Sequence, residues 1–422
     1  MWYGNEYYCM GENVDSLSSG IARRPFLAGT ATLAAGALGS RYAVERVSAA
    51  SADSLGSAVA ISIHPKFGVY YAAGAPGDDE VRPNAGAVSV FRRGKTGPTD
   101  ISRLTATDGD VGDRFGHAVT MDTDRARQYV FVGAPGEREQ GSNAGAVYAY
   151  RGRPGNPTDW SQYWKFTALD GRPGDELGHA LAAAGEYIVV GAPGADGNVG
   201  AAYVLDDRGS QSYRLVPRDG APADRFGTAV ATDGRYFLVG APGAGNTGAA
   251  YLFDGKKQVA KLVPSDAAGG DRFGTAVAAG QYLAIGAPNA STENGRTGRV
   301  YVYRSRKPIL FTTLEPQDGA PGDRFGAAVD TEGASILVGE PGGSSGGGGT
   351  AGAAFLYTLK GDRVGTFIAT DADQGDNLGT AVAMTANELI VGSPGDDDVA
   401  ANSGAAYVFE LRYDPLLSKF TG

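Results

Sequence analysis

The residues best placed to do chemistry in this sequence are acids in two short runs. One run is Asp78, Asp79 and Glu80, and the other is Asp396, Asp397 and Asp398. Carboxylate oxygens on flexible loops suit the variable geometry of calcium, and concentrated negative charge also suits a basic partner. If the fold brings the two runs together, the sequence predicts a weak cation site or partner site made of these six residues. If it does not, they are two freely solvated loops.

A second acidic pattern repeats along the chain as an Asp followed five residues later by another Asp. Most of these segments contain Gly, so the simpler interpretation is that the carboxylates accept backbone N–H bonds in turns. A cation-binding role is the alternative. The pairs are Asp108 and Asp113, Asp170 and Asp175, Asp219 and Asp224, Asp266 and Asp271, Asp318 and Asp323, and Asp371 and Asp376.

Signals for catalysis are weak. Two of the three histidines, His117 and His179, each follow a Phe-Gly or Leu-Gly pair at a place where the other repeats have small residues, which indicates a structural position. The sequence has no Gly-x-Ser-x-Gly, His-Glu-x-x-His or Walker-type motif. We therefore predict no catalytic residue, and no cofactor apart from calcium. Acid–base chemistry by paired carboxylates stays open, because Asp is abundant.

The elements that must position these residues are seven repeats of roughly 50 residues each. Each repeat has a Phe-Gly or Leu-Gly pair, then Gly-Ala-Pro or a one-residue variant, then a Gly and a β-rich run. Three strand-like runs per repeat (a, b and c), with a fourth (d) leading into the next repeat, are typical of a four-stranded antiparallel propeller blade. The sequence therefore predicts an all-β, seven-bladed β-propeller. The pairs begin at Leu55, Phe115, Leu177, Phe226, Phe273, Phe325 and Leu378, and the triplets at Gly74, Gly133, Gly191, Gly240, Gly286, Gly339 and Gly392.

The ends of the chain predict how the ring closes. No fourth strand of the repeat type follows Tyr407, whereas residues 44–49 precede the first Leu-Gly pair, where strand d stands in the other repeats. The N-terminal strand should therefore complete the last blade and leave no open sheet edge. Ring closure should also make the two acidic runs neighbours. The repeated Gly and Pro have backbone explanations: positive φ or close approach of strands for Gly, and the end of strand b for Pro.

With these motifs the chain resembles the FG-GAP repeat family, the β-propeller also found in the head of integrin α subunits. The resemblance covers roughly residues 44–411 and implies a binding or adhesion module on a propeller fold. Integrin-type repeats often place an Asp-x-Asp-x-Asp-Gly calcium loop between strands a and b. Here that connection is too short in repeats 3 to 7, and only Asp122-Thr-Asp124 hints at it. Calcium at that family position is not expected.

The N-terminal segment predicts export. Arg23 and Arg24, followed by Phe26 and Leu27, precede a weakly apolar stretch at 28–38 and resemble a twin-arginine signal. The stretch is too short to span a bilayer. We expect residues 1–39 to be the signal segment and residues 40–422 the propeller, with a retained signal anchor or a chance arginine pair as alternatives. The only Cys, Cys9, lies upstream of the expected cleavage, so the mature domain would hold no disulfide.

The charge of the chain limits the classes of function that are expected. The net charge of −10 argues against a nucleic-acid binder. In an up-and-down blade the d–a and b–c loops share one face, here acidic, and the c–d loops on the other face carry Arg and Lys. We predict a secreted or cell-surface binding or adhesion module that uses one face to contact an extracellular protein or glycan, with no membrane span in the mature domain. The alternatives are an exported hydrolase or lyase acting on polysaccharide or phosphoester, and a structural surface component.

Overall fold

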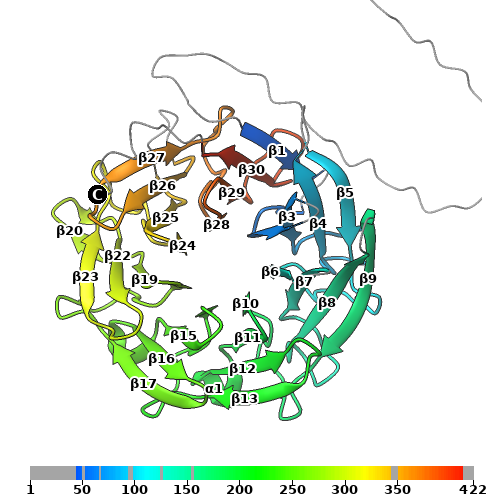
Figure 1. Cartoon of the computed structure of the whole chain (residues 1–422), viewed down its shortest axis with the longest axis horizontal. Helices are drawn as coiled ribbons and strands as arrows, with labels where there is room; N and C mark the ends of the chain where they lie inside the picture. The colour runs from blue at the N-terminus through cyan, green and yellow to red at the C-terminus, as the bar shows by residue number, and fades with distance from the viewer. Residues whose placement is uncertain are drawn as a thin grey trace, which may run out of the picture.

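Seven four-stranded antiparallel sheets surround a common axis in the computed structural model of the chain (Figure 1). The structure describes residues 44–49, 53–65, 68–93, 98–123, 127–153, 156–343 and 350–411. Within each sheet the strands follow the chain outward from the axis, so strand a is innermost and strand d is outermost. The predicted all-β, seven-bladed β-propeller is therefore confirmed.

The blades are numbered in chain order. Blade 1 holds β2 (Ala58–His64), β3 (Gly68–Ala75), β4 (Ala87–Arg93) and β5 (Pro98–Leu104). Blade 2 holds β6 (Ala118–Thr123), β7 (Gln128–Ala134), β8 (Ala146–Arg153) and β9 (Asn156–Phe166). Blade 3 holds β10 (Ala180–Ala184), β11 (Tyr187–Ala192), β12 (Ala201–Asp206) and β13 (Gln211–Leu215). Blade 4 holds β14 (Ala229–Thr232), β15 (Tyr236–Ala241), β16 (Ala249–Asp254) and β17 (Lys257–Leu262).

Blade 5 holds β18 (Ala276–Ala279), β19 (Tyr282–Ala287), β22 (Arg299–Arg304) and β23 (Leu310–Leu314). Blade 6 holds β24 (Ala328–Glu332), β25 (Ser335–Glu340), β26 (Ala353–Thr358) and β27 (Arg363–Phe367). Blade 7 holds β28 (Ala381–Met384), β29 (Glu388–Ser393), β30 (Ala405–Glu410) and β1 (Val44–Ser48). The b–c connections add α1 (Ala195–Asn198), η1 (Ala244–Asn246), and a hairpin of β20 (Ser291–Thr292) and β21 (Gly295–Arg296).

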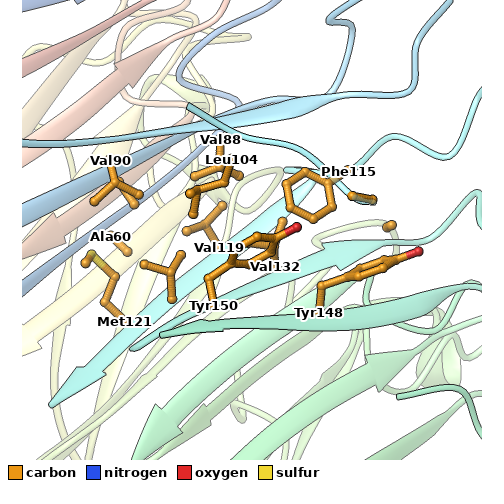
Figure 2. Packing of buried hydrophobic residues seen from close by; sticks show 14 of the residues in the cluster. Ala60, Val88, Val90, Leu104, Phe115, Val119, Met121, Val132, Tyr148 and Tyr150 are labelled. Carbon is orange, nitrogen blue, oxygen red and sulfur yellow. The ribbon is translucent and has the colours of Figure 1, made fainter. Parts of the chain in front are cut away.

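The hydrophobic core lies between neighbouring blades. Figure 2 shows Val88, Val90 and Leu104 of blade 1 packed with Phe115 and Tyr150 of blade 2. The ring of Phe115, from the Phe-Gly pair, meets the ring of Tyr150 edge-on at a centroid distance of 5.8 Å. Strand b is nearly continuous in buried apolar residues in every blade, because both of its faces contact other blades. Each blade therefore depends on its two neighbours for burial.

The Gly repeats form the backbone contacts between blades. A Cβ placed on Gly74, in the first Gly-Ala-Pro triplet, would lie 2.0 Å from the carbonyl oxygen of Gly116 in the next blade. The second glycine also has a φ of +93°, which favours Gly. Equivalent pairs occur around the ring, and Gly392 meets Gly56 to close it. Both expected roles of Gly are therefore confirmed, and β3 ends at Ala75, directly before the Pro of its triplet.

The N-terminal strand closes the ring, as predicted. β1 pairs antiparallel with β30, from Val44 opposite Phe409 to Ser48 opposite Ala405. A parallel bridge joins Leu55 to Gly404, the same bridge that joins Phe115 to Gly86 between blades 2 and 1. In the described part of the chain, no helix is long and apolar enough to cross a membrane.

Candidate functional site

A cluster of one Asp, one Tyr and one basic residue recurs in the blades. In blade 3 the Tyr203 hydroxyl donates a hydrogen bond to Asp170 at 3.0 Å, and the Arg214 guanidinium pairs with Asp170 at 3.0 Å. Tyr203 and Arg214 lie opposite each other on the two outer strands, β12 and β13. Burial is the main reason that the pKa of Tyr203 rises to about 12. We call this arrangement the Asp-Tyr-base cluster.

Other blades repeat the cluster with small changes. The first Asp of each sequence pair is thus held by a base of its own blade, which fixes the d–a loop to the outer strands. Blade 6 has Phe355 in place of the Tyr. The other ion pairs are Asp108–Lys165 at 2.7 Å, Asp219–Lys261 at 2.5 Å, Asp266–Arg299 at 2.8 Å, Asp318–Arg363 at 3.3 Å and Asp371–Arg46 at 3.3 Å.

The second Asp of each pair closes a turn. Asp224, for example, accepts a hydrogen bond from the backbone N–H of Ala221 at 2.9 Å, and Asp323 accepts one from Ala320 at 2.6 Å. These aspartates are buried, and burial raises the pKa of Asp323. The turn interpretation is confirmed for the second members of the pairs: Asp113, Asp175, Asp224, Asp271, Asp323 and Asp376.

The acidic run of blade 7 joins its Asp-Tyr-base cluster. Arg46, from β1, pairs with Asp371 at 3.3 Å, with Asp398 at 3.0 Å, and with the buried Asp396. The Tyr407 hydroxyl donates to Asp396 at 2.6 Å. Carboxylate oxygens of the three aspartates lie within 4.8 Å of one another. We call these residues the blade-7 cluster.

The acidic run of blade 1 is held by a different arginine. Arg103, from β5, pairs with Asp78 and, at 2.9 Å, with Glu80. Asp79 accepts a hydrogen bond from the backbone N–H of Asn84 at 2.8 Å. The two acidic runs therefore pair with different arginines, Arg103 and Arg46. The described acids that are grouped closely enough for a metal ion are those of the blade-7 cluster, which includes Asp396 and Asp398 but none of the blade-1 acids.

Arg46 bears on the fit of calcium at the blade-7 cluster. Its guanidinium already supplies the positive charge that a cation would bring to the three aspartates. Calcium therefore fits this cluster less well than it would fit six free carboxylates. The a–b connections of blades 3 to 7 are only two or three residues long, such as residues 185–186 between β10 and β11. They are too short for the integrin-type calcium loop, as the sequence indicated.

Seven residues precede the Phe-Gly and Leu-Gly pairs and stand just before the innermost strands. All have left-handed backbone, with φ between 53° and 63°. We call them the inner ring: Ser54, Arg114, Glu176, Arg225, Arg272, Arg324 and Asn377. Beside it the imidazole rings of His117 and His179 lie with their centroids 4.9 Å apart and their planes tilted by 50°. Burial lowers the pKa of both histidines to about 4, so both are neutral near pH 7.

The d–a and b–c loops share one face, which we call the loop face. The backbone N–H of Arg114, in a d–a loop, donates to the carbonyl of Asn84, in a b–c loop, at 3.0 Å. The b–c loops differ between blades, with α1 in blade 3, η1 in blade 4 and the β20–β21 hairpin in blade 5. On the opposite face Arg93 pairs with Glu388 and Glu410, both at 3.0 Å. Each face therefore carries paired charge of both signs.

Comparison with known protein families agrees with this architecture. Six segments match the model of the FG-GAP repeat, at residues 98–150, 160–205, 210–253, 257–303, 311–357 and 362–409. These segments cover more than half of the chain, so it belongs to the FG-GAP repeat family. No curated protein matches the chain significantly. The FG-GAP propeller is a protein-interaction fold, and the chain is a member of that class.

The sequence did not reveal the Asp-Tyr-base clusters or the inner ring. A signal for the clusters was present, since Tyr stands at the same place in most c strands and a base stands in the d strand of most of the same blades. The predicted export residues Arg23, Arg24, Phe26 and Leu27 lie outside the described residues, as does the expected signal segment 1–39.

Proposed function

We propose that this protein is an exported or cell-surface binding module that contacts a protein partner through its loop face. One observation carries the proposal: the framework repeats in seven blades, whereas the b–c loops on this face differ in length and structure. Binding residues are commonly carried by variable loops that a rigid scaffold positions. The a–b turns of blades 3 to 7 are short and uniform, which makes the opposite face less suited to recognition.

A loop exchange tests the choice of face. Replacing residues 291–296, the β20–β21 hairpin of blade 5, with a short Gly-Ser turn should abolish binding to the surface of the producing cells. A matched control replaces the a–b turn Asp233-Gly234-Arg235 of blade 4, on the opposite face, with Gly-Ser-Gly. Binding of the fluorescent proteins to cells is measured by flow cytometry. Loss of binding in the control with retention in the hairpin variant would assign the function to the other face.

Export rests on the N-terminal sequence. Paired guanidinium groups are the expected recognition element of a twin-arginine signal, and Lys does not reproduce their geometry. We expect the double substitution Arg23→Lys and Arg24→Lys to retain the protein inside the cell, as measured by immunoblotting of cell and medium fractions. A protein secreted normally with both substitutions would contradict the export assignment.

One observation favours the alternative of an exported hydrolase or lyase. Glu340 replaces the Ala of a Gly-Ala-Pro triplet, is buried, and has an Oε1 atom without a hydrogen-bond partner. Burial raises its pKa to about 8, and strongly raised carboxyl pKa values cluster at functional sites. If this group were a general acid, Glu340→Gln would remove hydrolysis of a soluble polysaccharide panel. Binding to cells that survives the same substitution would leave the binding function standing.

A further inference from the structure

We propose that arginines of the inner ring form an anion site at the centre of the loop face, which receives an acidic loop tip of the protein partner. The site comprises Arg225, Arg272 and Arg324 of blades 4, 5 and 6, with Arg114 of blade 2. This inference rests on the proposed function, because it names the chemistry by which the same face would recognise its partner.

The backbone does not explain arginine at these positions. Arg272 has a φ of 59° and Arg324 a φ of 63°, a region that is costly for a residue with a Cβ. Gly or Asn would adopt it at lower cost, and the loop face uses Asn at other positive-φ positions, such as Asn84 and Asn143. Residues held in such conformations cluster at binding sites.

Most of these guanidinium groups lack a counter-charge. Arg272 and Arg324 are exposed and, like Arg114, form no ion pair with any described residue. Arg225 pairs with Glu176 at 2.9 Å, and its side chain remains 40% exposed. Elsewhere on this face the first Asp of each pair is held on a base of its own blade. Exposed arginines of d–a loops farther out, Arg172 and Arg218, also lack a described ion pair, so the inner ring differs from them in having several such arginines on adjacent blades.

The ring geometry places these arginines next to one another. Each precedes a Phe-Gly pair, and the glycines of adjacent blades touch: a Cβ on Gly240 would lie 2.0 Å from the Gly274 carbonyl oxygen, and one on Gly286 would lie 2.0 Å from that of Gly326. The positions in blades 4, 5 and 6 are therefore one blade apart, each just before the innermost strand of its blade. The positive charges of Arg225 and Arg114 both lower the pKa of His179, so both guanidinium groups lie close enough to this residue to affect its titration.

The charges that surround the inner ring favour a compact ligand over an extended one. Farther from the axis, Asp170, Asp219 and Asp318 hold side chains that are 49%, 49% and 76% exposed, and they contact the outer strands. An extended polyanion lying across the face would gain little there, because these aspartates already pair with Arg214, Lys261 and Arg363. A loop tip that presents one or two carboxylates would reach the centre alone, where guanidinium forks pair well with carboxylates. The geometry points to an acidic loop of a protein rather than to a sulfated glycan.

The test uses the propeller with two probes of different shape. One probe is a disulfide-cyclised peptide with Glu-Glu at its turn, and the other is a heparin hexasaccharide. In low salt, about 20 mM, we expect the propeller to bind the peptide more tightly than the hexasaccharide. The double substitution Arg272→Gln and Arg324→Gln should weaken peptide binding by about tenfold or more. The control, Arg172→Gln with Arg218→Gln, removes two exposed charges from d–a loops of the same face and should change it less than about twofold.

Stability separates a binding role from a structural one. Because Asn tolerates the left-handed conformation better than Arg, Arg272→Asn with Arg324→Asn should raise the melting temperature while it weakens peptide binding. A lower melting temperature in that variant, equal loss in the Arg172 and Arg218 control, or preference for the hexasaccharide would overturn the inference. If the hairpin variant loses cell binding but both arginine variants retain it, the inner-ring site fails and the loop-face function remains.

Discussion

Two sets of charged residues recur around the same face of the propeller, and they differ in how their charge is satisfied. In the Asp-Tyr-base clusters, Asp, Tyr and base hold each other between the outer strands, as Asp170, Tyr203 and Arg214 do. In the inner ring, arginines occupy strained backbone and three of them pair with no described residue. A repeat protein can thus use one set of positions for its framework and leave another set to a partner.

The largest expected effect on stability comes from disrupting the glycine contacts between neighbouring blades. Gly240→Ala would place a Cβ 2.0 Å from the carbonyl oxygen of Gly274, so blades 4 and 5 must move apart. We expect a loss of about 3 kcal/mol or more in unfolding free energy, or failure to fold. The control is Gly174→Ala, where a Cβ meets no atom within 4 Å and only the positive φ is strained, at a cost of about 1 kcal/mol. Denaturant unfolding measures both, and equal losses would contradict the role of the contact.

The next effect concerns the blade-7 cluster, where the framework closes. Arg46→Gln leaves Asp371, Asp396 and Asp398 without their counter-charge and should cost about 3 kcal/mol. The same variant should become calcium-responsive, because three carboxylates within 4.8 Å then lack a cation. Melting curves with and without millimolar calcium give the measurement.

The wild-type protein sets the control for calcium. Its melting temperature should change little with calcium, since Arg46 already neutralises the cluster. A large calcium effect on the wild type, lost when Asp396, Asp397 and Asp398 are changed to Asn, would instead establish the calcium site expected from the sequence.

A smaller effect should come from Glu340, which departs from the repeat within the framework. Its pKa is raised from 4.5 to about 8, mainly by burial. Between these two values the unfolded chain has released the proton that the folded chain still holds, so stability should fall as pH rises through this window, by up to about 1.4 kcal/mol per pH unit. Glu340→Gln should remove that slope, whereas Glu332→Gln, at an exposed position of the same blade, should keep it. The measurement is the free energy of unfolding between pH 5 and 8. If stability still falls with pH in Glu340→Gln, the raised pKa of Glu340 is not its cause.

Much of the fold was accessible from the sequence because its determinants are local and repeated. Gly after Phe or Leu, Pro after the triplet and the apolar runs each specify a strand or its end, and seven copies in register leave few alternatives. The closing strand was accessible for the same reason, since the last repeat lacks one strand and the first has one to spare. These arguments need only spacing and residue type.

The site was less accessible because it depends on which side chains meet across strands. The two acidic runs were expected to form one group, but separate arginines on β5 and β1 hold them, and cross-strand pairing such as that of Arg46 with Tyr407 follows from register. The inner ring carries its signal in backbone conformation. The φ of 59° at Arg272 cannot be inferred from its residue type. Only its position, directly before a Phe-Gly pair, links Arg272 to the other six residues of the inner ring.

The central claim is that the loop face makes the contact with a protein partner, and hydrogen exchange of the complex tests it most directly. Once a partner is captured from the cell surface and purified with the propeller, amide exchange is compared in the free and bound states. Our account predicts protection at d–a and b–c loops such as residues 79–85, 270–274 and 291–297, with little change at the a–b turns. Protection confined to the a–b and c–d turns, with unchanged exchange at the inner ring, would contradict it.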